Sequence, residues 1–173
     1  MEIVSVKHNT QILIGDYQFP GMIKSEFLSL IGTTSPYANS IPTVVTGWNW
    51  EPDNEKFNNL KECILNALET TFKPGLRVDG SSIPLQCEDF WANVYEKGDH
   101  IPPHNHRPST YSFVYFVKAK WYHAPFVFTD SGKRIRPKEG RFVIFPSMVD
   151  HHVPKHRYKD TRITLSGNFK IGQ

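Results

Sequence analysis

From residue 88 onward the chain is a succession of short β-type runs, and this succession constrains the fold most strongly. The runs are FWANVY, YSFVYFV, PFVFTD, GRFVIF and TRITLSGNF, rich in Val, Ile, Phe and Tyr and separated by Gly, Pro, Asp and Lys. They recur about every ten to fifteen residues, with no helical period between them. This pattern predicts an antiparallel β-sandwich or barrel in the second half of the chain.

The first half mixes expected strands with expected helices. IVSV, ILIG and TVVTGWNW (43–50) read as strands, and residues 22–32 predict a short helix that ends at Gly32. A clearer amphipathic helix is predicted over 53–72, with Asp53 as its N-cap and Pro74-Gly75 after its end. We therefore expect a mainly β fold with flanking helices, of the α+β class.

Length and composition favour one soluble domain. The 173 residues show no repeat or linker, so we expect a single domain over 1–173, with 1–87 supplying N-terminal strands and support helices and 88–170 the core. Cys63 and Cys87 have no tight spacing, which favours a reducing compartment. No leader or membrane-length apolar run is visible, so we expect a soluble cytoplasmic protein without a membrane partner.

The histidines gather in the second half of the chain. Seven of the eight lie between His100 and His156. His104 and His106 stand at i and i+2, a spacing that on a strand puts both side chains on one face, roughly 6.5 Å apart. A polar turn is the alternative for this pair. A metal site needs a third ligand, which His151 or His152 can supply after the run GRFVIF.

The last predicted strand carries a second polar set. Alternation along it puts Arg162, Thr164 and Ser166 on one face and Ile163 and Leu165 on the other. A guanidinium fork with neighbouring hydroxyls suits a bound carboxylate.

The segment from Tyr95 to His106 resembles the iron(II)/2-oxoglutarate-dependent oxygenases, whose fold is a double-stranded β-helix, or jelly roll. The likeness is to their prolyl-hydroxylase-like branch, which carries Tyr-x-x-Gly-x5-His-x-Asp. Tyr95, Gly98 and His104 are in register with that motif, and His106 takes the place of the aspartate. Oxygenases of marine bacteria and their phages that carry His-x-His and Arg-Ile-x-x-Ser-x-Asn-Phe are more similar still.

The same likeness extends to the end of the chain and covers about residues 88–170. FPSMVDHHV resembles the run that leads into the family's distal ligand, and this alignment selects His151 over His152. Arg162-Ile163-Thr164 matches the family's Arg-x-Ser, with threonine in place of serine.

The resemblance implies an enzyme that uses Fe(II), O2 and 2-oxoglutarate to hydroxylate a substrate, with release of succinate and CO2. It implies that His104, His106 and His151 hold iron, with no catalytic residue beyond the metal centre. It further implies that Arg162 pairs with the distal carboxylate of 2-oxoglutarate. For additional cosubstrate contacts it leaves Tyr95, Tyr115 and Thr164 as candidates.

The departure from the family is His106, because the usual facial triad has two histidines and one carboxylate. Three histidines also form catalytic zinc sites and some cupin sites. A cupin-like metalloenzyme that does not use 2-oxoglutarate is therefore an alternative, and a non-catalytic jelly-roll binding module is another. Arg162 has no role in a generic cupin, which favours the oxygenase.

Expectations about partners are less specific. The prolyl-hydroxylase likeness favours a peptide or protein substrate, by analogy. The segment 151–162 is rich in Lys, Arg and His and reads as a solvated turn or an electropositive rim. Nucleic acid is not expected as a partner, since no interleaved aromatic pattern accompanies those charges.

Overall fold

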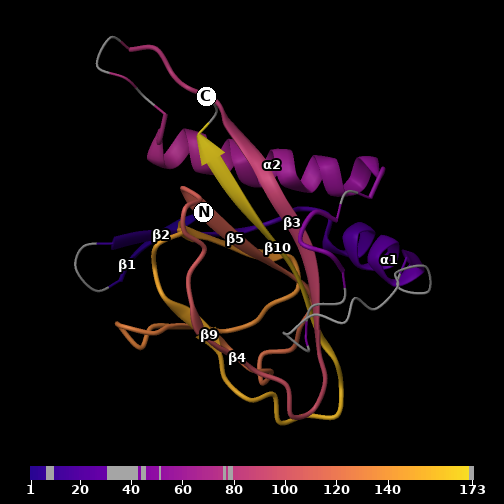
Figure 1. Ribbon diagram of the computed structural model, residues 1–173. Helices are drawn as coiled ribbons and strands as arrows, with labels where there is room; N and C mark the ends of the chain where they lie inside the picture. Colours follow the sequence, from indigo (N-terminus) through magenta and orange to yellow (C-terminus); the bar gives the residue numbers. More distant parts are fainter. Residues whose placement is uncertain are drawn as a thin grey trace.

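The chain forms two antiparallel β-sheets with two helices, seen in a computed structural model that describes residues 1–6, 10–30, 43, 46–50, 52–75, 77 and 80–171 (Figure 1). In chain order the elements are β1 (Glu2–Val6), β2 (Thr10–Asp16), α1 (Pro20–Leu30), α2 (Glu55–Phe72), β3 (Leu85–Tyr95), β4 (Ile101–His104), β5 (Tyr111–Lys118), β6 (Phe126–Phe128), β7 (Arg134–Ile135), β8 (Arg141–Pro146), β9 (His151–Val153) and β10 (Arg162–Ile171). No helix in the described part of the chain is long and apolar enough to cross a membrane.

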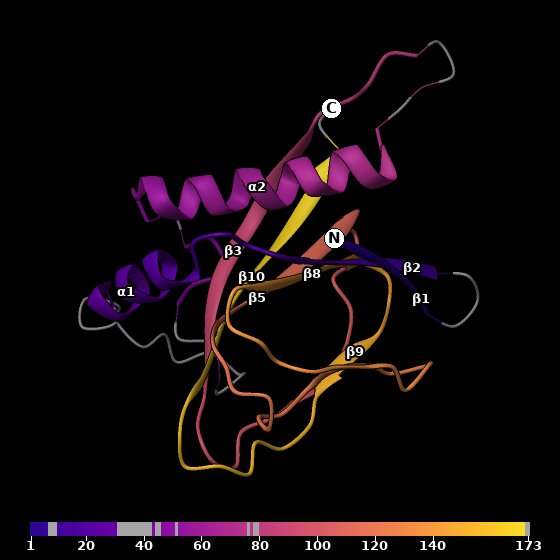
Figure 2. The same cartoon turned by 180° about the vertical axis from the view of Figure 1, so that it is seen from behind.

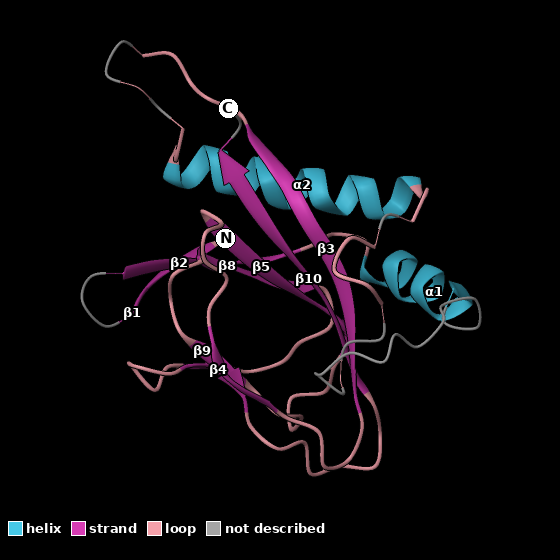
Figure 3. Cartoon of the chain, viewed as in Figure 1, coloured by secondary structure: helices cyan, strands magenta, loops and turns pink. Residues whose placement is uncertain are grey.

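The strands form a large sheet and a small sheet. The large sheet has the order β1-β2-β8-β5-β10-β3, and the small sheet has the order β4-β9-β6-β7. The small sheet and its long connections lie across one face of the large sheet, and the helices lie on the other (Figures 2 and 3). The expected jelly roll with flanking helices is confirmed.

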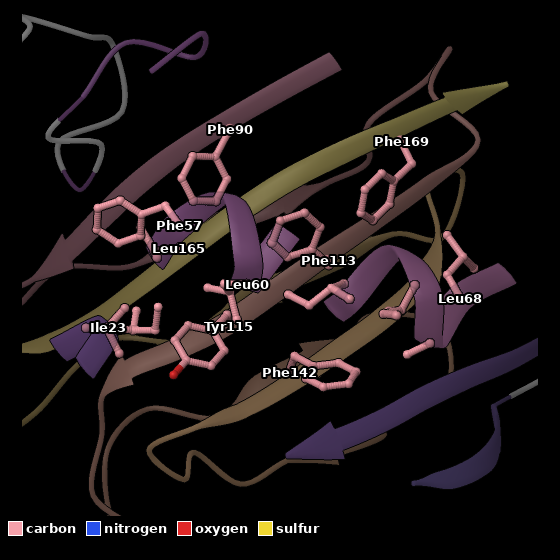
Figure 4. Packing of buried hydrophobic residues seen from close by; sticks show 14 of the residues in the cluster. Ile23, Phe57, Leu60, Leu68, Phe90, Phe113, Tyr115, Phe142, Leu165 and Phe169 are labelled. Atoms are coloured by element: carbon pink, nitrogen blue, oxygen red, sulfur yellow. The ribbon is translucent and has the colours of Figure 1, made fainter. Parts of the chain in front are cut away.

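Each face of the large sheet buries its own hydrophobic cluster. Helix α2 packs Phe57, Leu60 and Leu68 over the outer face, against Phe113 and Phe169 among others (Figure 4). The cluster between the sheets contains Val114, Phe116, Phe126, Phe128, Val143 and Phe145. Strand β5 therefore sends alternate side chains into two different cores, as the pleat of a strand requires.

Helix α2 begins one residue later than predicted. The N-cap is Asn54 rather than Asp53, and its side chain accepts a hydrogen bond from the backbone N–H of Lys56 at 3.0 Å. An extended N-cap side chain of this type satisfies one of the free N–H groups of the first turn. The helix ends at Phe72 before Lys73 in the left-handed region, and Pro74-Gly75 follow as expected. Helix α1 is present as predicted but begins at Pro20, two residues before the predicted start, and the predicted end at Ile31 and Gly32 lies outside the described residues.

The strand predicted over 43–50 is wrong for the residues that the structure describes there. Thr43 and residues 46–50 have a single isolated bridge, between Asn49 and Phe90. The segment still follows the free edge of β3: Phe90 donates its N–H to the Trp48 carbonyl at 3.0 Å, and Ala92 donates to Thr46 Oγ1 at 2.9 Å. A side-chain oxygen thus replaces a ladder carbonyl. The edge of β3 is covered without becoming a regular strand pair.

Candidate metal centre and anion pocket

Three histidines converge between the sheets. His104 ends β4 and pairs across the small sheet with His151, the first residue of β9. His106 lies beyond the end of β4, so the expectation that both histidines of the His-x-His pair share one strand is wrong. The three ring centroids are 4.3 to 5.0 Å apart, and one ring nitrogen from each histidine lies within 4.8 Å of the other two. This spacing fits three ligands around one ion.

Hydrogen bonds set the tautomers of two of these histidines. Nδ1 of His104 lies 2.9 Å from the Pro102 carbonyl, and Nδ1 of His151 lies 3.0 Å from the Val149 carbonyl. A carbonyl oxygen can only accept, so each Nδ1 carries a proton, and in the neutral ring Nε2 has the free lone pair. Backbone carbonyls commonly orient metal-binding imidazoles in this way. The donor set therefore fits a divalent metal without a change of protonation.

Burial keeps the rings of His106 and His151 neutral. It lowers the pKa of His106 to about 4, with a smaller contribution from the charge of His104. It also lowers the pKa of His151 well below its usual value, and His151 packs against the rings of Phe126 and Phe145 at 4.9 and 4.7 Å. Neutral imidazole is the form that binds metals.

These pKa shifts predict an acid-sensitive metal-free protein. Between the unfolded value of 6.5 and the lower folded values, the unfolded chain binds more protons than the folded chain, so the free energy of unfolding falls as the pH falls. We expect the midpoint of thermal unfolding without metal to be constant above about pH 7 and to drop between about pH 6.5 and 4. A double variant His106→Asn/His151→Asn should lose most of this dependence. An unchanged pH profile in that variant would contradict the assignment.

The turn that carries the distal ligand is held by a buried polar network. Ser147 Oγ lies 2.8 Å from Ser112 Oγ, which donates to Asn168 Oδ1 at 2.8 Å. Asn168 in turn donates to Asp89 at 2.8 Å. The carbonyl of Ser147 accepts the backbone N–H of His106 at 2.8 Å. One residue, four positions before His151, therefore fixes the backbone of a second ligand.

Replacing Ser147 should loosen this turn. Ser147→Ala removes one buried hydrogen bond and is expected to lower the free energy of unfolding by about 1 kcal/mol, measured by denaturant titration. Ser29→Ala is the matched control, because its hydroxyl is exposed and bonded within one helical turn. That control is expected to change stability by no more than about 0.5 kcal/mol. Equal effects of the two changes would refute a special role for Ser147.

A second bridge joins the two ligand-bearing turns on their outer side. Asn105, between the two ligands of the His-x-His pair, donates to Asp150 at 2.7 Å. Both residues line an open cavity of about 390 Å³, together with Arg107 and Met148. The carboxylate directly before His151 thus holds Asn105, and it is not bonded to an imidazole.

Arg162 is buried with its charge uncompensated. Its side chain is fully buried at the start of β10, and its guanidinium lies over the rings of Tyr95 (4.3 Å) and Phe116 (5.2 Å). None of its three side-chain nitrogens has a hydrogen-bond acceptor in good geometry among the described residues. Burial lowers the pKa of Arg162 and raises that of Tyr95, so the neighbouring hydroxyl is neutral and offers no counter-charge. A buried, unpaired guanidinium is costly on its own, and its donors suit an anionic ligand.

Of the three other residues predicted to contact the cosubstrate, two lie beside Arg162 and one lies elsewhere. Tyr95 pairs with Arg162 across β3 and β10, and Thr164 follows on the same face with its buried hydroxyl unpartnered. Tyr115 points to the opposite face of the large sheet, where its ring packs 6.2 Å from Tyr17 in the helix-side core. The tyrosine candidate at position 115 is thus separated from the pocket by the sheet itself.

Further residues line the space between the histidines and β3. Asn93 and Ser166 contact each other there, at 3.3 Å, and Oδ1 of Asn93 is buried without a partner. Trp91 lies 5.4 Å from the His106 ring, and the Trp48 ring lies 4.6 Å from Trp91, tilted by 56°. Alternation with Tyr95 and Trp91 indicates Asn93 from the sequence. No sequence signal could have placed Trp48, since it belongs to the irregular segment along β3.

Another compact group, His123, His156 and Asp160, does not have the protonation of a metal site. Its ligand atoms also lie within 4.8 Å of one another. However, Nδ1 of His123 accepts the backbone N–H of Lys120 at 3.3 Å, so its proton is on Nε2 and is donated to Asp160 at 3.0 Å. The Lys120 ammonium lies 3.1 Å from the same carboxylate oxygen. The group is a hydrogen-bonded support for the loop before Arg162.

The comparisons agree with this geometry. Residues 127–168 match the profile of a family described as "Putative 2OG-Fe(II) oxygenase". The matched range contains His151, Arg162 and Thr164. No curated protein matches the sequence.

Solved structures share the fold at low sequence identity. A viral collagen prolyl hydroxylase from Paramecium Bursaria Chlorella virus-1, in complex with 2-oxoglutarate, matches with a TM-score of 0.71 and 10% identity over 94% of this chain and 96% of that one. A Pseudomonas putida prolyl-4-hydroxylase matches with a TM-score of 0.65 and 14% identity, over 94% and 93%. A Trichoplax adhaerens prolyl hydroxylase, in complex with a hypoxia inducible factor peptide, matches with 0.64 and 12%, over 92% and 83%.

The profile match covers the distal half of the site, and the fold supplies the rest of the jelly roll around it. Residues 127–168 thus match a 2OG-Fe(II) oxygenase profile, and the chain as a whole has the fold of these prolyl hydroxylases.

Proposed function

We propose that the chain hydroxylates a substrate with Fe(II), O2 and 2-oxoglutarate, and that succinate and CO2 are released. The proposal rests on one observation: two groups of residues, each suited to one end of the same ligand, lie in the same protein interior. Three histidines lie on the small-sheet side, and an unpaired buried guanidinium lies on the large sheet. A dicarboxylate with a metal-chelating keto-acid end is a ligand that satisfies both.

The chain's own residues bind and orient. His104, His106 and His151 would hold the iron, and the bound metal with its cosubstrate would supply the oxidising chemistry. Arg162 offers a bidentate fork to the distal carboxylate, and the Thr164 hydroxyl can add a donor. The rings of Tyr95 and Phe116 exclude water from that ion pair, which strengthens it.

A ligand set of three histidines is one unit more positive than one with a carboxylate. This charge favours an anionic cosubstrate, and it predicts that His106→Asp keeps its metal. We expect His106→Asp to bind Fe(II) anaerobically at one equivalent, while His106→Ala binds it more weakly than either. Titration with Co(II), followed by its visible absorption, measures this directly. A His106→Asp variant that holds no metal would show that His106 does not occupy a ligand position.

We further propose a peptidyl substrate. Two of the similar structures are a collagen prolyl hydroxylase and a prolyl hydroxylase bound to a peptide. In this chain Trp48, 40% exposed, stands over Trp91 beside the histidines and gives the pocket an aromatic wall. Such a wall can pack against an apolar group of a bound segment.

The test is anaerobic reconstitution with Fe(II), followed by measurement of O2 uptake and succinate formation with and without 2-oxoglutarate. Slow succinate formation without a substrate is expected, since uncoupled turnover needs only the cosubstrate site. Absence of both turnover and keto-acid binding in metal-loaded protein would overturn the proposal. Metal binding without keto-acid binding would instead favour a cupin-like enzyme, and failure to bind any divalent metal would favour a binding module.

A further inference from the structure

Three aromatic rings gather on the surface at the Arg162 end of the jelly roll. Tyr122 lies 5.7 Å from Trp121 and 4.6 Å from Tyr158, which comes from the loop before β10. Trp121 is 73% exposed and Tyr158 is 42% exposed. Large rings at this exposure lose hydrophobic stabilisation unless a ligand covers them.

Cations surround these rings. Lys155, Arg157 and Lys159 are exposed on the same loop as Tyr158, and none of them has an ion pair among the described residues. Lys120 is 56% exposed, lies 5.6 Å above the Tyr122 ring and contacts Asp160. We call these rings and cations, residues 120–122, 155 and 157–159, the aromatic–basic surface.

Hydrogen bonds hold the two loops that carry the aromatic–basic surface. His156 is fully buried, and its Nε2 bonds the Asp160 carbonyl at 2.8 Å, which closes the loop that carries Tyr158. Its backbone is bonded to Gly98 and Asp99 at 2.8 Å each. Tyr122 donates to Asp160 at 3.0 Å, so the two loops of the surface are joined. The two loops and the Tyr122 ring are therefore held in place before any ligand arrives, which reduces the entropy lost on binding.

We propose that the aromatic–basic surface binds single-stranded nucleic acid. Bases stack on exposed aromatic faces without sequence preference, and unpaired cations neutralise the phosphates. An acidic peptide would use the cations but would leave the flat faces of Trp121 and Tyr158 uncovered. The sequence could not show this arrangement, because the two loops are separated by about 35 residues and meet only in the fold. The inference stands independently of the proposed oxygenase activity.

The test uses metal-loaded full-length protein and a fluorescent twelve-nucleotide oligothymidylate, followed by anisotropy between about 50 and 300 mM salt. We expect a dissociation constant in the micromolar range at the low-salt end. With four phosphate contacts, the slope of log K against log salt is expected to be about −3, from roughly −0.7 per contact. The triple variant Lys155→Gln/Arg157→Gln/Lys159→Gln should reduce the slope to about −1.

Matched variants separate this surface from charge in general. Lys133→Gln/Arg134→Gln/Arg136→Gln removes three exposed cations at and beside β7 and should leave the slope unchanged. Trp121→Ala/Tyr158→Ala should weaken binding about tenfold or more at an unchanged slope, while Phe19→Ala, also exposed, should have no effect. Both aromatic changes are at exposed positions, and unfolding curves will confirm that the variants fold.

Three outcomes would overturn the proposal. These are no binding at 50 mM salt, equal losses in the two triple variants, or oligoglutamate binding as tightly as the oligonucleotide with no effect of the aromatic changes. The last result would assign the surface to an acidic protein partner. Concentration-dependent dimerisation that the aromatic variants abolish would assign it to a second copy of the chain.

Discussion

Arg162→Met is expected to abolish 2-oxoglutarate binding while leaving the metal-free chain at least as stable as the wild type. Methionine fills much of the same volume and removes a buried guanidinium that has no acceptor among the described residues. The desolvation cost of an unpaired buried charge is several kcal/mol, so we expect a gain of roughly 1–3 kcal/mol in the free energy of unfolding. A substitution that raises the free energy of unfolding but abolishes ligand binding identifies a residue whose role is to bind the ligand.

Thermal unfolding with and without 2-oxoglutarate measures both effects. At a hundredfold excess over its dissociation constant the ligand stabilises the wild type by about 2.7 kcal/mol, and this increment should vanish in Arg162→Met. Arg141→Met, on the same sheet but paired with Asp16, should keep the full increment. Arg162→Lys should keep only part of it, because an ammonium lacks the planar fork. An Arg162→Met protein that is still stabilised by 2-oxoglutarate would exclude the assigned carboxylate site.

His151→Ala is expected to lower divalent-metal affinity by roughly a hundredfold or more, since it removes one of three ligands from a site whose supporting contacts alone are each worth 10- to 100-fold. His152→Ala is the natural control. The two histidines are adjacent in sequence, but Nδ1 of His152 bonds the Thr129 hydroxyl at 3.0 Å, away from the other two ligands. Its loss should change metal affinity by no more than a few-fold.

Isothermal titration with Co(II) or Zn(II) under anaerobic conditions gives both affinity and stoichiometry. The wild type should bind one equivalent, because a second ion at His123, His156 and Asp160 would have to displace the hydrogen bonds that both ring nitrogens of His123 make. Equal losses in His151→Ala and His152→Ala would contradict the geometry. A second tight equivalent in the wild type would contradict the tautomer assigned to His123.

Sequence reasoning succeeded where one periodicity was clear. Helix α2 was identified by its apolar spacing, and β10 by alternation, which correctly put Arg162 and Thr164 opposite Ile163 and Leu165. It identified β5 as a strand but did not assign its faces, because the residues from Ser112 to Val117 are all buried. A strand buried on both faces has no alternation to read, so the sequence alone could not tell which face Tyr115 occupies.

Local sequence patterns also could not predict the residues that support the site. Ser147, Ser112 and Asn168 are separated by 35 and 56 residues along the chain, and only the register of β5, β8 and β10 brings their short side chains together. The segment 43–50 looked like a strand because of its valines and tryptophans. Its pairing partner is the edge of β3, where a Thr46 hydroxyl interrupts the ladder.

The proposed site is divided between the two sheets, which would couple its ligands. The three histidines come from β4, its following turn and β9, while the guanidinium comes from β10 on the other sheet. A ligand bound at both ends would connect two sheets that are otherwise joined mainly by apolar contact. Metal and cosubstrate are then expected to raise each other's affinity by the same factor. Amide exchange in the short strands β4 and β9 should slow much more with both present than the two separate effects would predict.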